Sequence, residues 1–291
     1  MKKLLFVLFV LGFFTAKGQN PDVIKSDAII QEGRMQYLKA AELYAEAAKV
    51  YQSTQVTDTF CVYKAGQNYV RAKKYSTGLT YLQQAESLHF SDETMYLSLA
   101  DVYSGLKKYQ DAENMLSKGM ETYPALKADY TKKMAFLLYN SKQYKNAVHT
   151  LEEALGVYPR DITLLYLKGS SLERLNQYEG ASKVFEEVLK LNPNHKKSIT
   201  KLGVVFFKQT DAIYIQETKR YENLKNPSRI DYHNSVKKLE TISRGYEKAI
   251  PYLEKAYALN GKNKQIISCL YVAYRRLKME EKAVEMKLLL E

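Results

Sequence analysis

Apolar and small residues recur along this chain at three- and four-residue intervals, the spacing that places side chains on one face of an α-helix. The pattern takes a fixed form. An aromatic residue is followed after three positions by a small residue, after four more by a large one, and after three more by another small one. Clear copies are Tyr37-Ala40-Tyr44-Ala47 and Tyr144-Ala147-Leu151-Ala154; others begin at Tyr75, Tyr109, Tyr178 and Tyr246. The pattern predicts an all-α protein.

The small residue in this pattern repeats with a period of about 34 residues and one double step, at Ala40, Gly78, Ala112, Ala147, Ala181, Ala249 and Ala283. About twelve residues earlier stands a second small residue, at Ala28, Gly66, Ala100, Ala135, Gly169 and Gly203. Antiparallel helices approach closely only where side chains are small. Each period therefore predicts a helical hairpin that crosses at these residues, and prolines such as Pro124, Pro159 and Pro193 end three of the copies.

These residues resemble the tetratricopeptide repeat over roughly residues 21 to 291. The family's consensus tryptophan is replaced at Ile24, Val62, Tyr96, Thr131, Leu165 and Ile199. The resemblance implies a right-handed α-α superhelical solenoid in which each unit buries its apolar face against its neighbours. We assign repeats at about 21–54, 59–92, 93–126, 128–161, 162–195 and 196–261, and a partial one at 264–291. We expect the last helix, around 280–291, to cap the array with a charged outer face formed by Glu281, Lys282, Glu285 and Lys287.

The sixth unit is too long by about one repeat, and two interpretations remain open for residues 207–245. In the first, both helices are extended into a projecting hairpin with apolar residues from Phe207 to Leu224 facing those from Tyr232 to Tyr246, and a turn around Pro227. In the second, the segment is a degenerate repeat, but its small-residue positions would hold large or charged side chains. We favour the hairpin. A lengthened pair of this kind also resembles a subgroup of exported bacterial repeat proteins.

The N-terminus has the order of a secretory signal peptide: Lys2 and Lys3, an apolar run from Leu4 to Phe14, then Ala16-Lys17-Gly18. The apolar run is too short to span a bilayer, which needs about 20 residues. We therefore expect residues 1–18 to be removed near Gln19, and the protein to be periplasmic or secreted. No other segment is apolar enough for a membrane helix.

Motifs for catalysis are absent from the sequence. It contains no phosphate-binding glycine loop, no cluster of histidines or cysteines with metal-ligand spacing and no nucleophile motif. We predict that the protein is not an enzyme and uses no cofactor or metal. Its two cysteines, Cys61 and Cys269, are expected to be packed free thiols rather than a disulfide.

By the resemblance, the first helix of each pair lines the inner face of the solenoid, where a partner would bind. The inward positions are cationic and aromatic: Tyr63, Lys64, Arg71, Lys132, Lys133, Phe136, Tyr139, Asn140, Tyr166, Arg174, Lys201, Lys208, Arg275 and Arg276. Cations at these positions could pair with carboxylates of an extended peptide, while aromatic rings supply contact area. The alternative is that they are solvated charges and partly packed rings.

The sequence thus predicts a scaffold or adaptor of the cell envelope that holds a protein or peptide partner, possibly an acidic one. The formal net charge of +12 allows an alternative, binding of an acidic polysaccharide or nucleic acid. We do not expect nucleic acid, because the basic residues are spread over many helices. A third hypothesis is a self-assembling structural repeat protein. The partner's identity and the oligomeric state do not follow from the sequence.

Overall fold

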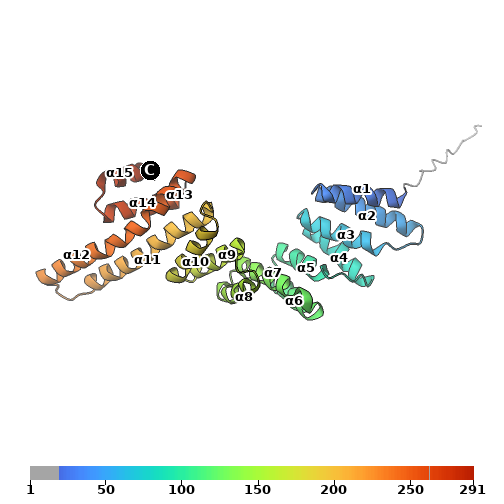
Figure 1. The fold of residues 1–291 in the computed structure, drawn as a ribbon, viewed down its shortest axis with the longest axis horizontal. Helices are drawn as coiled ribbons and strands as arrows, with labels where there is room; N and C mark the ends of the chain where they lie inside the picture. Colours follow the sequence, from blue (N-terminus) through green and yellow to red (C-terminus); the bar gives the residue numbers. More distant parts are fainter. Residues whose placement is uncertain (1–19, 262) are drawn as a thin grey trace, which may run out of the picture. The chain divides into compact units, whose positions relative to one another are not determined.

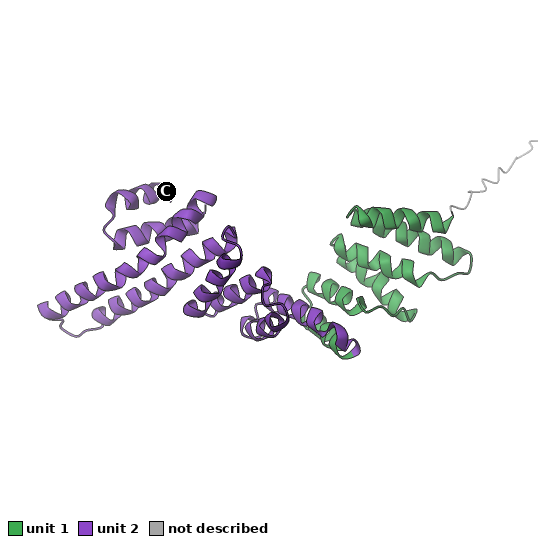
Figure 2. Cartoon of the chain, in the orientation of Figure 1, with its two compact units in different colours: residues 1–121 green, residues 122–291 purple. Residues whose placement is uncertain are grey.

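A computed structural model of the protein describes residues 20–261 and 263–291. The expected signal peptide, residues 1–18, lies outside the described residues. Within them the chain is helical and contains no strand. Contacts divide it into two compact units, one ending at Glu121 and the other running from Thr122 to Glu291 (Figure 2). Each unit is described below by itself.

Unit 1 consists of helices that run back and forth in succession (Figure 1). They are α1 (Pro21–Gly33), α2 (Tyr37–Ser53), α3 (Thr59–Arg71), α4 (Tyr75–Ser87), α5 (Met95–Gly105) and α6 (Tyr109–Thr122). Helix α1 packs on α2, α2 on α3, and α3 on α4, so each helix is covered by its neighbours in the chain.

Unit 2 continues the pattern with four ordinary helices and then a longer pair. Its elements are a 3-10 turn η1 (Pro124–Leu126), α7 (Lys127–Asn140), α8 (Tyr144–Val157), α9 (Ile162–Arg174), α10 (Tyr178–Leu191), α11 (Lys196–Glu222), α12 (Arg229–Ser243), η2 (Arg244–Lys248), α13 (Ile250–Leu259), α14 (Lys264–Arg276) and α15 (Glu280–Leu288). The predicted fold class, an all-α solenoid of helix pairs, is confirmed.

Helices cross at the small residues of the repeat pattern. Ala112, Ala147 and Ala181 are fully buried. A Cβ atom added to Gly169 on α9 would lie 2.8 Å from the ring of Phe185 on α10, and one added to Gly66 on α3 would lie 2.9 Å from Leu82 on α4. The small residue of each first helix therefore receives the large residue of the second helix, which is why both recur with the repeat.

The turn inside each ordinary pair has one residue in the left-handed backbone conformation. These residues have φ between 60° and 64° and are Met35, Lys73, Lys107, Lys142, Asn176 and Lys278. Each stands two positions before the aromatic residue of the pattern, except that Lys278 precedes Glu280. The amide of the next residue donates a hydrogen bond to a carbonyl of the first helix. For example, Lys74 N donates to the carbonyl oxygen of Tyr69 at 2.8 Å. This C-cap geometry ends the first helix and returns the chain antiparallel to it.

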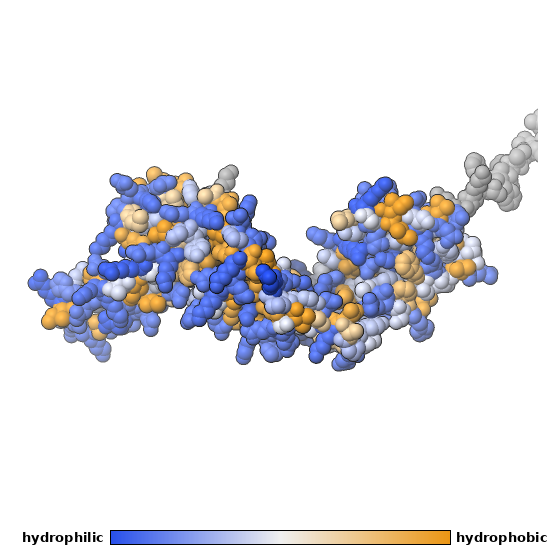
Figure 3. All heavy atoms as spheres, viewed as in Figure 1, coloured by the Kyte–Doolittle hydropathy of each residue, from blue (hydrophilic) through white to orange (hydrophobic). Residues whose placement is uncertain are grey.

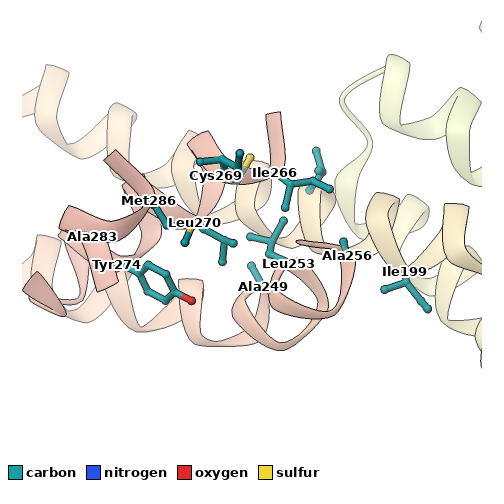
Figure 4. Close-up of a cluster of buried hydrophobic side chains, with 12 residues drawn as sticks. Ile199, Ala249, Leu253, Ala256, Ile266, Cys269, Leu270, Tyr274, Ala283 and Met286 are labelled. Carbon is teal, nitrogen blue, oxygen red and sulfur yellow. The ribbon is translucent and has the colours of Figure 1, made fainter. Parts of the chain in front are cut away.

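The hydrophobic core is a row of clusters, each shared by a second helix and the first helix of the next pair. The last cluster, shown in Figure 4, joins Leu253 and Ala256 of α13 to Ile266 and Leu270 of α14 and to Met286 of α15. Because each cluster bridges two pairs, no pair buries its apolar face alone.

Residues 207–245 hold the second half of the long helix α11 and all of α12, which pack on each other and are joined by residues 223–228. Helix α11 runs unbroken for 27 residues. Ser228 begins α12 with a capping box, in which its hydroxyl accepts from the amide of Asp231. The seam between the helices is not purely apolar, because the buried carboxylate of Glu217 lies in it beside Ser235 on α12.

The outer face of α15 differs from the expected charged cap. Glu281, Lys282, Glu285 and Lys287 are exposed, but so are Val284 at 56% and Leu288 at 65%. Across residues 20–261 and 263–291, no helix is both long enough and apolar enough to cross a bilayer.

Candidate partner-binding surface

The predicted binding residues lie on the first helices of the pairs: α3 in unit 1, and α7, α9, α11 and α14 in unit 2. We call the surface that these helices present the first-helix face, and describe it separately in each unit. Most of its cations are paired with carboxylates of this same chain rather than free in solvent.

In unit 1, one carboxylate on α1 holds two of the predicted cations of α3. Glu32 lies 3.2 Å from Nζ of Lys64 and 2.7 Å from Nη1 of Arg71, and it also accepts from the hydroxyl of Tyr44 at 3.0 Å. Burial works against ionisation of Glu32, but the charge and hydrogen bond of Lys64 outweigh it and lower the pKa of this carboxyl. These cations thus tie α3 to α1.

Tyr63 does not lie on this surface. Its side chain is 2% exposed, its ring stacks on Phe90 with centroids 4.7 Å apart, and its hydroxyl bonds to Asp92 and Thr94. It falls one helical position away from Lys64, on the side of α3 that faces the next pair. It is therefore a core residue.

In unit 2, Lys132 of α7 pairs with the residue that caps the next first helix. Its Nζ lies 2.6 Å from Asp161, whose other carboxylate oxygen accepts from the amides of Thr163 and Leu164 at the start of α9. Nζ of Lys132 also lies 5.2 Å from the ring of Tyr158. The same arrangement occurs in unit 1, where Lys25 bonds to the N-cap Asp58 at 2.7 Å.

A second cluster of two cations and one carboxylate on this face is centred on Glu173 of α9. One carboxylate oxygen lies 2.7 Å from Nζ of Lys201 and the other 2.7 Å from Nζ of Lys208, both on α11. Glu173 is 4% exposed, whereas the side chains of its two lysine partners are 27% and 37% exposed. Burial works against its ionisation, but the hydrogen bonds of the two lysines prevail and lower the pKa of Glu173. Two positive charges meet one negative charge, so the cluster has a net positive charge.

Polar and aromatic residues surround this cluster on α7 and α9. Arg174 and Asn140 are exposed at the ends of their helices, and Lys133 is half-buried. Tyr166 lies two turns before Glu173 on the same helix, with its ring 5.9 Å from that of Phe185 and 5.6 Å from His195. Burial and the charge of Lys197 lower the pKa of that histidine.

The two remaining aromatic candidates are half-buried on α7. Phe136 and Tyr139 pack against the cluster formed by α7, α8 and α9, and the ring of Tyr139 meets the edge of Tyr144 at 5.8 Å. They expose part of each ring and bury the rest, so each ring can contact a partner and also pack against the neighbouring helix.

Arg275 and Arg276 end α14 and have different environments. The guanidinium of Arg276 stacks on Tyr214 of the hairpin, 3.3 Å from the ring centroid, and lies 4.0 Å from Asp211. Arg275 is exposed and donates to the hydroxyl of Tyr271 one turn earlier at 3.3 Å. Arg276 therefore fixes α14 to the hairpin, whereas Arg275 remains at the surface.

Sequence reasoning missed the carboxylates that neutralise this face. Glu32 and Asp161 each lie about one repeat along the chain from the cations they bind, as Lys132 and Asp161 do with a separation of 29 residues. Asp211 stands further from Arg276, because the lengthened sixth unit lies between them. An acidic residue found one period from a predicted inward cation is the signal that would have identified them.

Chemistry beyond ion pairing is sparse in the part of the chain that the structure describes. No group of three or more histidine, cysteine, aspartate or glutamate side chains there could hold a metal ion. Cys61 and Cys269 are free and buried, which confirms the prediction of packed thiols.

Comparison with protein families gives one match. Residues 162–195, which comprise α9 and α10, match the tetratricopeptide repeat. Among curated proteins, human Protein O-mannosyl-transferase TMTC3 is 31% identical over 128 residues, covering 42% of this chain and 13% of that protein. Mouse Tetratricopeptide repeat protein 21A is 25% identical over 217 residues, covering 65% and 16%. The chain thus spans less than a fifth of the length of these relatives.

Solved structures share the fold at low sequence identity. PilF of Pseudomonas aeruginosa superposes with a TM-score of 0.54 at 16% identity, covering 79% of this chain and 89% of PilF. A MamA structure gives 0.52 at 15% identity, covering 68% and 89%. Residues 162–195 thus match a tetratricopeptide repeat, and the likeness to these solved structures shows that the chain shares their fold.

Proposed function

We propose that this protein is a non-catalytic scaffold that holds a protein partner on the first-helix face of unit 2. The observation that carries the proposal is the cluster of Glu173, Lys201 and Lys208, in which a buried carboxylate fixes two ammonium groups 2.7 Å from its oxygens. An ammonium group has three donors, and each of these lysines gives one to Glu173. The remaining donors and the excess positive charge are available to a partner.

The chemistry of the cluster favours an acidic segment of a protein. Carboxylates of aspartate, glutamate or a chain terminus would form charge-assisted hydrogen bonds with lysines that are already held in place. Preorganised cations lose little side-chain entropy on binding. Exposed Arg174 adds a planar donor group next to Glu173, and half-buried Tyr166 adds contact area. We propose an extended acidic peptide as the ligand of this surface.

No enzymatic activity is proposed. The relative that carries the name O-mannosyl-transferase is matched over 13% of its length, and the matched part of this chain consists of helix pairs. Binding of an acidic polymer is not proposed either, because the basic residues are spread over many helices, and Lys64, Arg71 and Lys132 each pair with a carboxylate of this chain. Export to the cell envelope is part of our proposal and rests on the N-terminal sequence alone. Sequencing the N-terminus of the protein from its own cells tests it, with a start near Gln19 as the expected result.

The binding proposal is tested by crosslinking in cells, followed by mass spectrometry of captured proteins. The test variant replaces Glu173, Lys201 and Lys208 together with glutamine, which removes the charges and leaves hydrogen-bonding groups of similar size. A matched control replaces the exposed residues Glu186, Lys190 and Lys196 in the same way, with the same change in net charge. We expect the test variant to lose its partners and the control to keep them. Equal capture by both variants would overturn the proposal.

A further inference from the structure

The first and last helices expose apolar side chains. At the positions of Val23, Ile30 and Val284, the other pairs bury the equivalent residue fully or in part. We call the outer face of α1, with Val23 and Ile30, the head, and the outer face of α15, with Val284 and Leu288, the tail. These side chains are 58%, 48%, 56% and 65% exposed. Figure 3 shows apolar side chains gathered over α1.

The head has the residues with which a first helix meets the preceding pair. Val23 stands five positions before the small residue Ala28. The equivalent residues of later first helices are at most 5% exposed, and one of them is a serine. They are Cys61, Met95, Tyr130, Leu164, Ser198 and Ile266. Leu164 lies in one cluster with Ala147, Leu151 and Ala154 of the preceding second helix. Ile30 corresponds to Asn68, Val102, Leu137, Ser171, Val205 and Ala273, which are also buried.

The tail has the residues with which a second helix meets the following pair. Val284 directly follows the small residue Ala283; the equivalent Val148 of α8 packs against the cluster formed by the next pair. Leu288 corresponds to residues that are mostly polar and exposed, namely Gln83, Ser117, Glu152 and Glu186. Glu152 still pairs with Lys168 of the next first helix at 3.0 Å, and Glu254 at the same position accepts from Tyr274 of α14 at 2.7 Å. Val284 is therefore the tail residue whose exposure differs from that of its equivalents.

Charge also distinguishes the two faces. Asp27 on the head and Lys287 on the tail are exposed. Apart from Lys168 on α9, their equivalents elsewhere are apolar, and several of them share one cluster across a junction. Such pairs are Tyr44 with Ala65, Leu82 with Leu99, Phe185 with Leu202, and Leu253 with Leu270. If a tail stacked on a head as one pair stacks on the next, Lys287 would face Asp27, and the two charges are opposite.

We propose that the tail of one copy of this chain stacks on the head of another, continuing the repeat-to-repeat interface between molecules. The head also has a groove of 200 Å³ between α1 and α2, lined by Asn20, Val23, Ile24, Asp27, Leu43 and Glu46, which can receive an apolar side chain of α15. Head and tail are different surfaces, so the contact is heterologous and adds copies in a row. This assembly does not depend on the proposed partner binding.

The test measures sedimentation of the purified protein over a wide range of concentrations. We expect the sedimentation coefficient of the wild type to rise with concentration. Ile30→Glu blocks the head and Val284→Asp blocks the tail, since it sets a carboxylate against a groove that contains Asp27 and Glu46, so each variant alone should remain monomeric. A mixture of the two should form dimers and nothing larger, because one free tail and one free head remain. Ile213→Glu, at a residue 51% exposed on α11 that belongs to neither the head nor the tail, is the control and should associate like the wild type.

A charge exchange tests the register of the contact. Asp27→Lys or Lys287→Asp alone should weaken association, and the double variant Asp27→Lys/Lys287→Asp should restore it. A wild type that stays monomeric at all concentrations would overturn the proposal, as would association that Ile30→Glu and Val284→Asp leave unchanged. A mixture of blocked variants that fails to pair would do the same. Circular dichroism of each variant confirms that it is folded.

Discussion

Nζ of Lys201 on α11 lies 2.7 Å from the carboxylate of Glu173 on α9, and this contact joins the first helices of two consecutive pairs. Lys208, two turns further along α11, holds the other carboxylate oxygen at the same distance. A carboxylate that is 4% exposed is stable only where positive charge compensates the loss of water. The ion pairs therefore fix the position of α11 on α9 as well as the charge of the surface.

Replacing Glu173 with glutamine should destabilise unit 2. The change leaves Lys201 and Lys208 close together without the charge between them. Because both lysines are partly exposed, solvent screens their repulsion, and we expect a loss of about 1–2 kcal/mol in the free energy of unfolding. Urea unfolding followed by circular dichroism measures it. Glu186→Gln, on the exposed side of α10, should change stability by less than about 0.5 kcal/mol. Equal effects of the two substitutions would contradict a structural role for the cluster.

The buried carboxylate of the hairpin predicts a pH dependence. Hydrogen bonds from Arg220 and Lys238 lower the pKa of Glu217 to about 2, against the opposing effect of burial. A carboxyl group whose pKa is lower in the folded than in the unfolded state stabilises the fold above its unfolded value. The hairpin should therefore be fully stabilised by this group above the ordinary value of 4.5 and lose that contribution as the pH falls towards about 2.

Carbon NMR of the side-chain carboxyl group of Glu217 measures this pKa directly. We expect a midpoint near 2, and Glu217→Gln should abolish the acid sensitivity of the contact between α11 and α12. A midpoint at or above the ordinary 4.5 would show that Arg220 and Lys238 do not hold the carboxylate in solution.

The sequence predicted those features that depend on residue size and spacing. Ala147 and Gly169 are buried at helix crossings because their recurrence with the repeat reflects a steric requirement. It did not predict that Lys132 would be neutralised, because its partner Asp161 is a whole repeat away and no local pattern links the two. Tyr63 was wrongly assigned to the first-helix face for a related reason. Tyr63 and Lys64 are neighbours on α3, yet one lies in the core and the other on the first-helix face. The residue spacing of a single helix does not show where the boundary between these two faces runs.

Two glycines on neighbouring helices should respond oppositely to alanine. At Gly169 the added Cβ would lie 2.8 Å from the ring of Phe185, so the helices must separate, at a cost of about 1–3 kcal/mol. At Gly156 in α8 nothing lies within 4 Å of the added atom, so the higher helix propensity of alanine should stabilise the protein by about 0.5 kcal/mol. Thermal unfolding of the two variants against the wild type distinguishes these outcomes. If Gly169→Ala were neutral, close contact at this crossing would not be required.

The two cysteines allow each unit to be followed separately, because Cys61 belongs to unit 1 and Cys269 to unit 2. Burial raises the pKa of each thiol to about 12, compared with an ordinary value of 9.0. The thiolate is the reactive form, so this shift alone should slow labelling by about a thousandfold.

In the native protein, alkylation should therefore proceed only as each unit opens, whereas in urea both thiols should react at once. Single variants Cys61→Ser and Cys269→Ser assign the two rates, and mass spectrometry of labelled peptides measures them. Rapid labelling of either thiol in the native protein would show that its helix pair is open in solution, because no packed core would then protect it.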